Sequence, residues 1–237
     1  MNEYRFFAEK KATPFAHFIA EQMHKKLFRL FRKKIPQDGV SILEIGPGLG
    51  NFTKWITTVP GMSYTGYEPE SVLCKRLQEK GLKVVNQRIP PTQETDESQD
   101  VVVMLNVLEH FLGLTQAQEM AAELYRILKK NGVAFLTFPN YMDWKRDFFN
   151  LDYTHCFHTT EVSASQLFLD AGFSIEFIGH HNGCFFSDFG RIPNMLAHWA
   201  RAFLMTVLPR SIGRKEKIQK MGVLFSENII LVARKKM

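Results

Sequence analysis

Apolar and basic side chains alternate with a helical period near the start of the chain. Between residues 15 and 34, Phe18, Leu27 and Phe31 belong to an apolar stripe, and the lysines and arginines fall largely on the other side. The Pro36–Gly39 turn then ends the pattern. We therefore predict an amphipathic N-terminal helix over 15–34.

From residue 40 onwards, short apolar runs alternate with amphipathic stretches. The runs predict strands at 40–46, 63–67, 83–86, 100–105, 133–138, 173–179 and 228–234. The stretches predict helices at 50–59, 70–80, 115–129 and 163–170. Residues 139–160 form a long aromatic and polar connection. Such alternation is typical of an α/β fold, a parallel sheet with helices on both faces.

The length of 237 residues suits one domain with additions. We divide it into an N-terminal helical segment (1–36), a core (37–180), a helical insertion (181–227) and a last strand (228–237). The insertion carries the apolar run 195–208, which as a helix would be about 21 Å long, short of the ~30 Å membrane interior. With the basic residues that follow, it predicts a lid, a homodimer interface or a contact with an anionic membrane surface.

Composition narrows the function classes. The net charge of +6 is too small to argue for nucleic-acid binding unless the basic residues are clustered. The three cysteines, Cys74, Cys156 and Cys184, are far apart, which excludes a disulfide framework and a CxxC zinc site. The first residues contain acids and bases with no apolar run, so no secretory signal is visible. We expect a cytoplasmic protein, at most peripheral to a membrane.

A glycine-rich loop follows the first predicted core strand. The stretch 44–50 reads E-x-G-x-G-x-G, and Asn51 breaks the G-x-G-x-x-G pattern of NAD-binding proteins. Glycines let the chain turn sharply and let a ligand approach the backbone. Glu68 ends the second strand, about 20 residues later, where an acid can accept hydrogen bonds from ribose hydroxyls. Together the two features predict a nucleoside-binding site.

These residues resemble the class I S-adenosylmethionine-dependent methyltransferases over 40–180 and the final strand. The resemblance implies a Rossmann-like seven-stranded sheet whose last two strands are antiparallel, with S-adenosylmethionine as cofactor and S-adenosylhomocysteine as product. It places Glu68 at the ribose, and the glycine loop against the ribose and methionine part. The loop residues that it assigns to the cofactor are Glu44, Gly46, Gly48 and Gly50.

The resemblance continues after the third and fourth strands. Asp100 opens the fourth strand as in the family, and the family pattern places Leu105 and Asn106 beside the amino-acid end of the cofactor, with His110 nearby. After the third strand many members carry an acid for the adenine amino group. Here Gln87 and Arg88 stand instead, so we expect the adenine contact from Gln87 or from backbone groups.

The D-x-T-H stretch at 152–155 resembles a methyltransferase subgroup found among sugar- and cell-envelope-modifying enzymes. Histidine titrates near neutrality, so we take His155 as the favoured base, His158 as the second candidate and Asp152 as an orienting group. The alternative is that His155 only holds the loop. These side chains lack a clear third metal ligand, so we expect no metal site. The acceptor-binding candidates from the same connection are Asn140, Tyr141, Trp144 and Tyr153.

We therefore expect a methyltransferase that acts on an oxygen of a small molecule or of a free or lipid-linked glycan, with no nucleic-acid partner. Transfer to nitrogen or carbon stays open, because an amine needs no strong base. An NAD(P)-dependent oxidoreductase is disfavoured by Asn51 and by the lack of a Tyr-x-x-x-Lys pair. A non-catalytic scaffold is disfavoured by the intact glycine loop, and RNA methylation by the lack of an Asn/Asp-Pro-Pro-Tyr/Phe tetrapeptide after the fourth strand.

Overall fold

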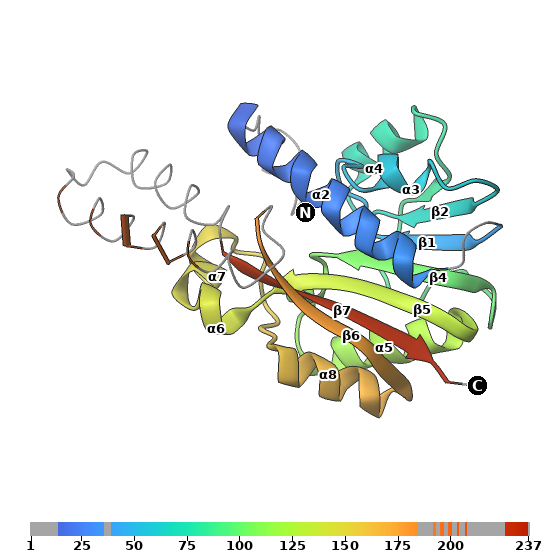
Figure 1. Cartoon of the computed structure of the whole chain (residues 1–237). Helices are drawn as coiled ribbons and strands as arrows, with labels where there is room; N and C mark the ends of the chain where they lie inside the picture. The colour runs from blue at the N-terminus through green and yellow to red at the C-terminus, as the bar shows by residue number, and fades with distance from the viewer. Residues whose placement is uncertain are drawn as a thin grey trace.

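A computed structural model describes residues 14–35, 39–183 and 226–236, together with Ile192, Met195, Leu196, Trp199, Ala200, Phe203 and Val207. Its seven-stranded sheet has the order β3-β2-β1-β4-β5-β7-β6 (Figure 1). The strands are β1 (Ser41–Ile45), β2 (Ser63–Tyr67), β3 (Val84–Val85), β4 (Gln99–Leu105), β5 (Leu128–Pro139), β6 (Phe173–Asn182) and β7 (Glu227–Lys235). The helices are α2 (Pro14–Lys34), α3 (Thr53–Ile56), α4 (Ser71–Gln78), the 3₁₀ turn η1 (Leu108–His110), α5 (Leu114–Ile127), α6 (Tyr141–Trp144), α7 (Arg146–Leu151) and α8 (Glu161–Asp170).

The direction of the strands confirms the predicted architecture. β1 to β5 run parallel to one another, whereas β7 is antiparallel to both β5 and β6. The chain order reverses between β1 and β4, which lie side by side. In open α/β sheets this reversal opens a crevice beyond the carboxyl ends of the strands, where ligands bind.

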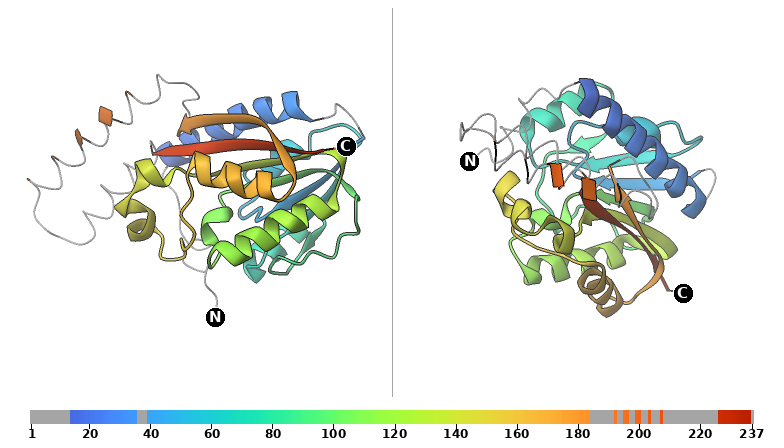
Figure 2. Two further views of the ribbon diagram at one scale, coloured as in Figure 1. Left: turned by 90° about the horizontal axis from the view of Figure 1, so that it is seen from below. Right: turned by 60° about the vertical axis from the view of Figure 1, so that its left-hand side comes forward.

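Two apolar layers cover the sheet, because successive side chains of a strand point to opposite faces. Ile42 and Phe135 pack with Phe31 of α2 on one face. Their sequence neighbours Leu43 and Leu136 pack with α5 and α8 on the other. Figure 2 shows α2 on one side of the sheet and α5 and α8 on the opposite side. The strands are therefore buried on both faces, as their continuous apolar runs predicted.

Several boundaries differ from those expected. The helix predicted at 50–59 is only four residues long, and the helix predicted at 115–129 ends at Ile127. There Leu128 already pairs with Gln99 of β4, so strand pairing overrides the helical pattern. The connection 139–160 contains α6 and α7. The division of the chain into segments stays a prediction, and most of the insertion lies outside the described residues.

Within the part of the chain that the structure describes, no helix combines the length and the hydropathy that crossing a membrane requires.

Candidate functional site

A cleft with a volume of about 260 Å³ opens at the carboxyl ends of β1, β2 and β4. Six of the residues expected at the cofactor line it: Gly46, Gly48, Glu68, Arg88, Asn106 and His110. The wall also includes residues that the sequence did not single out, among them Tyr67, Val107 and Gln116. The structure thus brings together parts of four loops, those after β1, β2, β3 and β4, at the point where the strand order reverses.

The glycine loop makes close backbone contacts. Gly46 has a φ of +65°, and a Cβ atom placed on it would lie only 2.7 Å from Cγ2 of Val107 in the loop after β4. Its N–H donates to the carbonyl oxygen of Tyr67 at 2.8 Å. At Gly50, with a φ of +75°, a Cβ would lie 2.8 Å from Cδ2 of Leu77 in α4. Only glycine satisfies both the left-handed backbone and the close packing at these positions.

Glu68 connects the second strand to this loop. Its carboxylate accepts the N–H of Gly48 and the N–H of Glu70, both at 2.9 Å. The side chain is buried, and burial raises the pKa of Glu68 although both hydrogen bonds oppose that shift. A carboxylate has about four acceptor positions, so two backbone donors leave capacity for the hydroxyls of a ribose.

Glu44, which the sequence assigned to the cofactor, lies in a buried polar environment. Its carboxylate is buried and accepts the hydroxyls of Thr53 at 2.6 Å and Tyr64 at 2.8 Å, and it does not line the cleft. Burial raises the pKa of Glu44 to about 7. Glu44 therefore links β1 to α3 and β2 on the sheet face opposite Leu43 and Ile45, and its contact with the cofactor stays a prediction.

Three further residues expected at the cofactor lie outside the lining of the cleft. Gly50 packs against α4, as described above. The side-chain amide of Gln87 donates to the carbonyl oxygen of Pro91 at 2.8 Å, and Leu105 packs with the apolar layer under α2. Asn106, by contrast, lines the cleft with a φ of +54°, and its side-chain oxygen accepts the Thr137 hydroxyl at 2.8 Å.

The D-x-T-H loop folds back onto η1. Oδ1 of Asp152 accepts both the N–H of Thr154, at 2.9 Å, and the Thr154 hydroxyl, at 2.6 Å. Oγ1 of Thr154 also lies 2.9 Å from Nδ1 of His110. Because the single hydroxyl proton goes to the carboxylate, Nδ1 of His110 must be the donor in this second bond. The lone pair of the neutral His110 imidazole is then on Nε2.

His155 is buried behind His110, and the two ring centroids are 5.0 Å apart. Nδ1 of His155 lies 2.7 Å from the carbonyl oxygen of Phe148, which can only accept, so this nitrogen carries the proton. Nε2 lies 3.7 Å from Oδ2 of Asp152. Burial lowers the pKa of His155, and it lowers that of His110 to about 4 with a further contribution from His155. Both rings are neutral at pH 7.

Glu109 lies next to His110 in the chain, and its role was not predicted from the sequence. It is 1% exposed, and burial raises the pKa of its carboxyl to about 8. Its backbone carbonyl accepts the N–H groups of Cys156 and Phe157, which fixes the D-x-T-H loop beside η1. Among the described residues, Oε2 of Glu109 has no hydrogen-bond partner. Its position next to His110 in the sequence was the signal that could have identified it.

The other candidates from the connection have separate places. His158 is exposed, and its ring lies 4.9 Å from that of Tyr141. Asn140 caps α6 and donates from its amide to Oε1 of Glu227 at 2.6 Å. Trp144 is buried and donates from its indole to the carbonyl oxygen of Glu227 at 2.9 Å, whereas Tyr153 is 70% exposed. Asn140 and Trp144 thus anchor α6 to the start of β7, and binding of the acceptor by these residues stays a prediction.

Solved structures with the same fold include several methyltransferases. A protein from Galdieria sulphuraria described as a sarcosine dimethylglycine methyltransferase superposes with a TM-score of 0.67, over 90% of this chain and 85% of that one, at 13% identity. A chain from the complex of the Haloferax volcanii Trm112 methyltransferase activator with a methyltransferase gives 0.72, over 99% and 96%, at 13% identity. An N-methyltransferase from Haemonchus contortus, bound to phosphomonomethylethanolamine and S-adenosylhomocysteine, gives 0.63, over 90% and 53%, at 14% identity.

Sequence comparison identifies the family. No curated protein matches the chain in sequence. A family model described as "Methyltransferase domain" matches residues 15–176, well over half of the chain, from α2 to the middle of β6. The matched region contains the glycine loop, Glu68 and the loop after β4, which form the cleft. The chain therefore belongs to the S-adenosylmethionine-dependent methyltransferase family, and S-adenosylmethionine is its cofactor.

Proposed function

We propose that this methyltransferase transfers the methyl group to a hydroxyl oxygen of a small molecule or glycan. The observation that carries the proposal is the orientation of His110 at the wall of the cofactor cleft. Thr154 and Asp152 fix its Nδ1 as a donor, so its Nε2 is the nitrogen that can accept a proton. A hydroxyl is a weak nucleophile whose proton must leave as the methyl group arrives, so transfer to oxygen needs such a group.

In this proposal the D-x-T-H loop fixes the orientation of the His110 imidazole. Asp152 acts on His110 through the hydroxyl of Thr154. His155, the base favoured from the sequence, is the second imidazole of the pair and helps to keep His110 neutral. Tyr153 extends from the same loop with a largely exposed ring, and we assign it to the acceptor. His158 contacts Tyr141 and takes no part in proton transfer.

Replacing Thr154 tests this arrangement without touching either imidazole. Thr154→Val removes the hydroxyl that joins Asp152 to His110, so we expect kcat to fall by about tenfold or more while S-adenosylhomocysteine affinity stays within about twofold. Thr154→Ser retains the hydroxyl and should retain activity. Nitrogen NMR of the His110 ring should show one tautomer in the wild type and in Thr154→Ser, and a mixture in Thr154→Val. Equal kcat values for all three proteins would contradict the role of the loop.

The acceptor atom is tested with S-adenosylmethionine labelled in its methyl group. Free oligosaccharides, polyprenyl-diphosphate-linked oligosaccharides and a set of primary and secondary amines serve as three acceptor pools. We expect label on a hydroxyl oxygen of a saccharide, identified by mass spectrometry of the product. The alternative is N-methylation, which the N-methyltransferase with a similar fold exemplifies. Label on the amines alone would favour that alternative and overturn our proposal.

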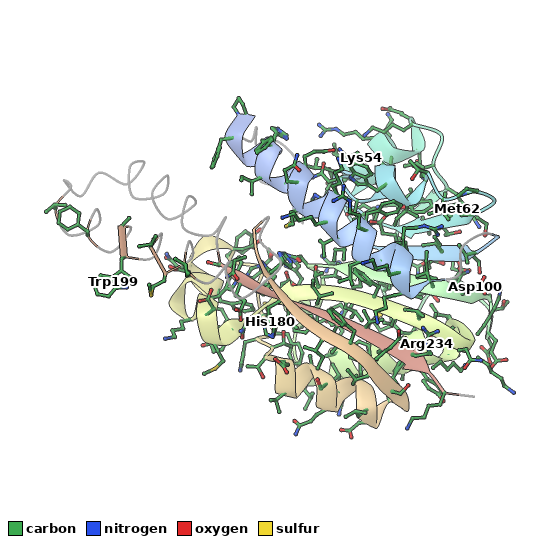
Figure 3. The ribbon with its side chains drawn as sticks, in the orientation of Figure 1. Lys54, Met62, Asp100, His180, Trp199 and Arg234 are labelled. Atoms are coloured by element: carbon green, nitrogen blue, oxygen red, sulfur yellow. The ribbon has the colours of Figure 1, made fainter. Side chains whose placement is uncertain are left out.

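We further propose that the acceptor is lipid-linked and that the insertion contacts the cytoplasmic face of a membrane. Six exposed apolar side chains recur at helical spacing, with exposed fractions from 53 to 74%: Ile192, Met195, Leu196, Trp199, Phe203 and Val207. Trp199 lies well away from the sheet and its covering helices (Figure 3). The basic residues between 210 and 220 follow in the sequence and would favour anionic lipids.

Vesicle co-sedimentation tests this contact. The protein should bind vesicles of mixed phosphatidylcholine and phosphatidylglycerol at low salt, and high salt should release part of it. Trp199→Glu with Phe203→Glu should abolish binding. Val162→Glu, which changes an equally exposed apolar residue on α8, should not. Failure of the wild type to bind, or equal binding by both variants, would contradict the membrane contact. A salt-insensitive dimer in solution would point to a homodimer interface instead.

A further inference from the structure

His110, which lines the cleft, and the buried Glu109 and His155 beside it have the composition of a metal site. One carboxylate oxygen of Glu109 and one ring nitrogen from each of His110 and His155 all lie within 4.8 Å of one another. They come from two segments, η1 and the D-x-T-H loop, so the folded chain creates the group. From this geometry we infer that Glu109, His110 and His155 bind a divalent transition-metal ion. The sequence had predicted no metal site, because His155 and His158 with Asp152 nearby lacked a clear third ligand. It did not show that Glu109 and His110 would lie beside His155.

An independent observation supports a cation at this point. Oε2 of Glu109 is completely buried and, among the described residues, no donor reaches it. Burying a carboxylate oxygen without a partner is costly, so native structures rarely retain one without a function. A bound cation would satisfy this oxygen.

The hydrogen bonds of the two histidines resemble those of metal-ligating imidazoles. In known sites the ligating imidazole donates its other N–H to a carbonyl oxygen or to a carboxylate system, which fixes the tautomer. His155 donates from Nδ1 to the Phe148 carbonyl oxygen, and His110 donates from Nδ1 to the Thr154 hydroxyl, which itself donates to Asp152. Both Nε2 atoms therefore carry the lone pairs. The backbone bonds from Cys156 and Phe157 to Glu109 hold the two segments together.

The donor set indicates which ion would bind. Two imidazoles and one carboxylate suit Zn²⁺ and related first-row ions, whereas Mg²⁺ prefers oxygen ligands. Ligand atoms of one tetrahedral Zn²⁺ are about 3.4 Å apart, so the side-chain ends must close by a small distance on binding. Three protein ligands leave one position open. Asp152, whose Oδ2 lies 3.7 Å from Nε2 of His155, is a further carboxylate beside the group.

The position of the ion also gives it a role in the proposed O-methylation, and this part of the inference rests on that function. His110 lines the cofactor cleft, so a ligand in the open position would face the methyl donor. A metal-bound hydroxyl loses its proton far more easily than a hydroxyl in water. With the ion bound, both Nε2 atoms would be ligands, and the ion would lower the pKa of the acceptor hydroxyl. The proton of this hydroxyl would then pass to Asp152 or to water instead of to His110.

Metal binding is measured on the untagged, metal-depleted full chain, without methyl transfer. We expect titration calorimetry with ZnCl₂ alone to show one site per chain, and MgCl₂ to show none. CoCl₂ alone should give the visible absorption of a tetrahedral site with nitrogen and oxygen ligands. Glu109→Gln and His155→Gln should each weaken Zn²⁺ binding by more than the ~10–100-fold typical of losing a supporting partner. Circular dichroism verifies that each variant is folded.

Two matched controls complete the experiment. His17→Gln changes an exposed histidine on α2, and Cys156→Ser removes the exposed thiol next to His155. Both should bind Zn²⁺ like the wild type. No stoichiometric Zn²⁺ in the wild type, binding that survives Glu109→Gln and His155→Gln, or binding lost in Cys156→Ser would each overturn the inference. Because none of these readouts involves methyl transfer, their failure is distinct from a failure of the proposed O-methylation.

Discussion

The carboxylate of Glu68 accepts the N–H of Gly48 at 2.9 Å, and this bond joins the end of β2 to the glycine loop after β1. The two residues are 20 positions apart in the sequence and line the same cleft. The acid therefore both shapes the loop and faces the ligand. Removing it should affect stability and cofactor binding together.

Glu68→Ala should weaken S-adenosylhomocysteine binding by about 1–3 kcal/mol, the usual cost of losing a hydrogen bond to a charged group. Calorimetric titration of the purified variant measures this directly. Glu79→Ala, an exposed acid at the end of α4, is the control and should leave the affinity unchanged. If Glu68→Ala binds as tightly as the wild type, Glu68 does not hold the ribose.

Gly46→Ala should destabilise the protein more than Gly81→Ala. Both glycines have positive φ, at +65° and +80°, so alanine costs roughly 1 kcal/mol of backbone strain at either position. Only at Gly46 does the new Cβ meet another atom, 2.7 Å away on Val107, whereas nothing lies within 4 Å at Gly81. We expect an additional loss of about 1–3 kcal/mol at Gly46 in urea unfolding.

The double variant Gly46→Ala with Val107→Ala separates the clash from the strain. It should recover part of the additional loss, because the Cγ2 atom that meets the new Cβ is gone. Equal destabilisation by Gly46→Ala and Gly81→Ala would show that the close approach of the two loops is not tight.

Glu44 should make stability depend on pH. Its folded-state pKa of about 7 is raised above the ordinary value of 4.5, so the folded protein binds a proton that the unfolded chain releases between these pH values. The stabilisation is therefore fully present below pH 4.5 and is lost as the pH rises through 7. Integrated over this window, it amounts to about 3 kcal/mol.

Glu44→Gln should remove this contribution. Urea unfolding at pH 5, 6, 7 and 8 should show a shallower fall in stability with rising pH for the variant than for the wild type. Parallel curves for the two proteins would mean that the buried Glu44 carboxyl does not titrate in this range.

Trp144→Phe should cost about 1 kcal/mol of stability. The substitution removes the indole N–H that donates to the carbonyl oxygen of Glu227, and so loosens α6 from the start of β7. Trp55→Phe is a matched control, because the buried indole nitrogen of Trp55 has no partner among the described residues. It should be neutral or stabilising. A larger loss at Trp55 than at Trp144 would contradict the assignment.

Some of these contacts could be predicted from the sequence, and others could not. The meeting of Gly48 and Glu68 was predictable, because adjacent parallel strands end at the same edge of the sheet. The environment of Glu44 was within reach too, since it shares a strand face with Ile42 rather than with Leu43. The contact of Trp144 with Glu227 spans 83 positions, and no local pattern encodes it.

The Glu109–His110–His155 group was not predicted for the same reason. Glu109 and His110 follow β4, whereas His155 belongs to a loop that returns after β5 and two short helices. Each residue alone fits a packing or capping role. Only the folded chain places His155 beside His110 and leaves Glu109 buried between the segments.

The central claim is that the cleft beyond β1, β2 and β4 binds S-adenosylmethionine. It is tested most directly by calorimetric titration of the wild-type protein with S-adenosylhomocysteine, with NADH and NADPH titrated in parallel. We predict one micromolar site for S-adenosylhomocysteine and no binding of either dinucleotide. Binding of a dinucleotide, or of none of the three ligands, would contradict the account.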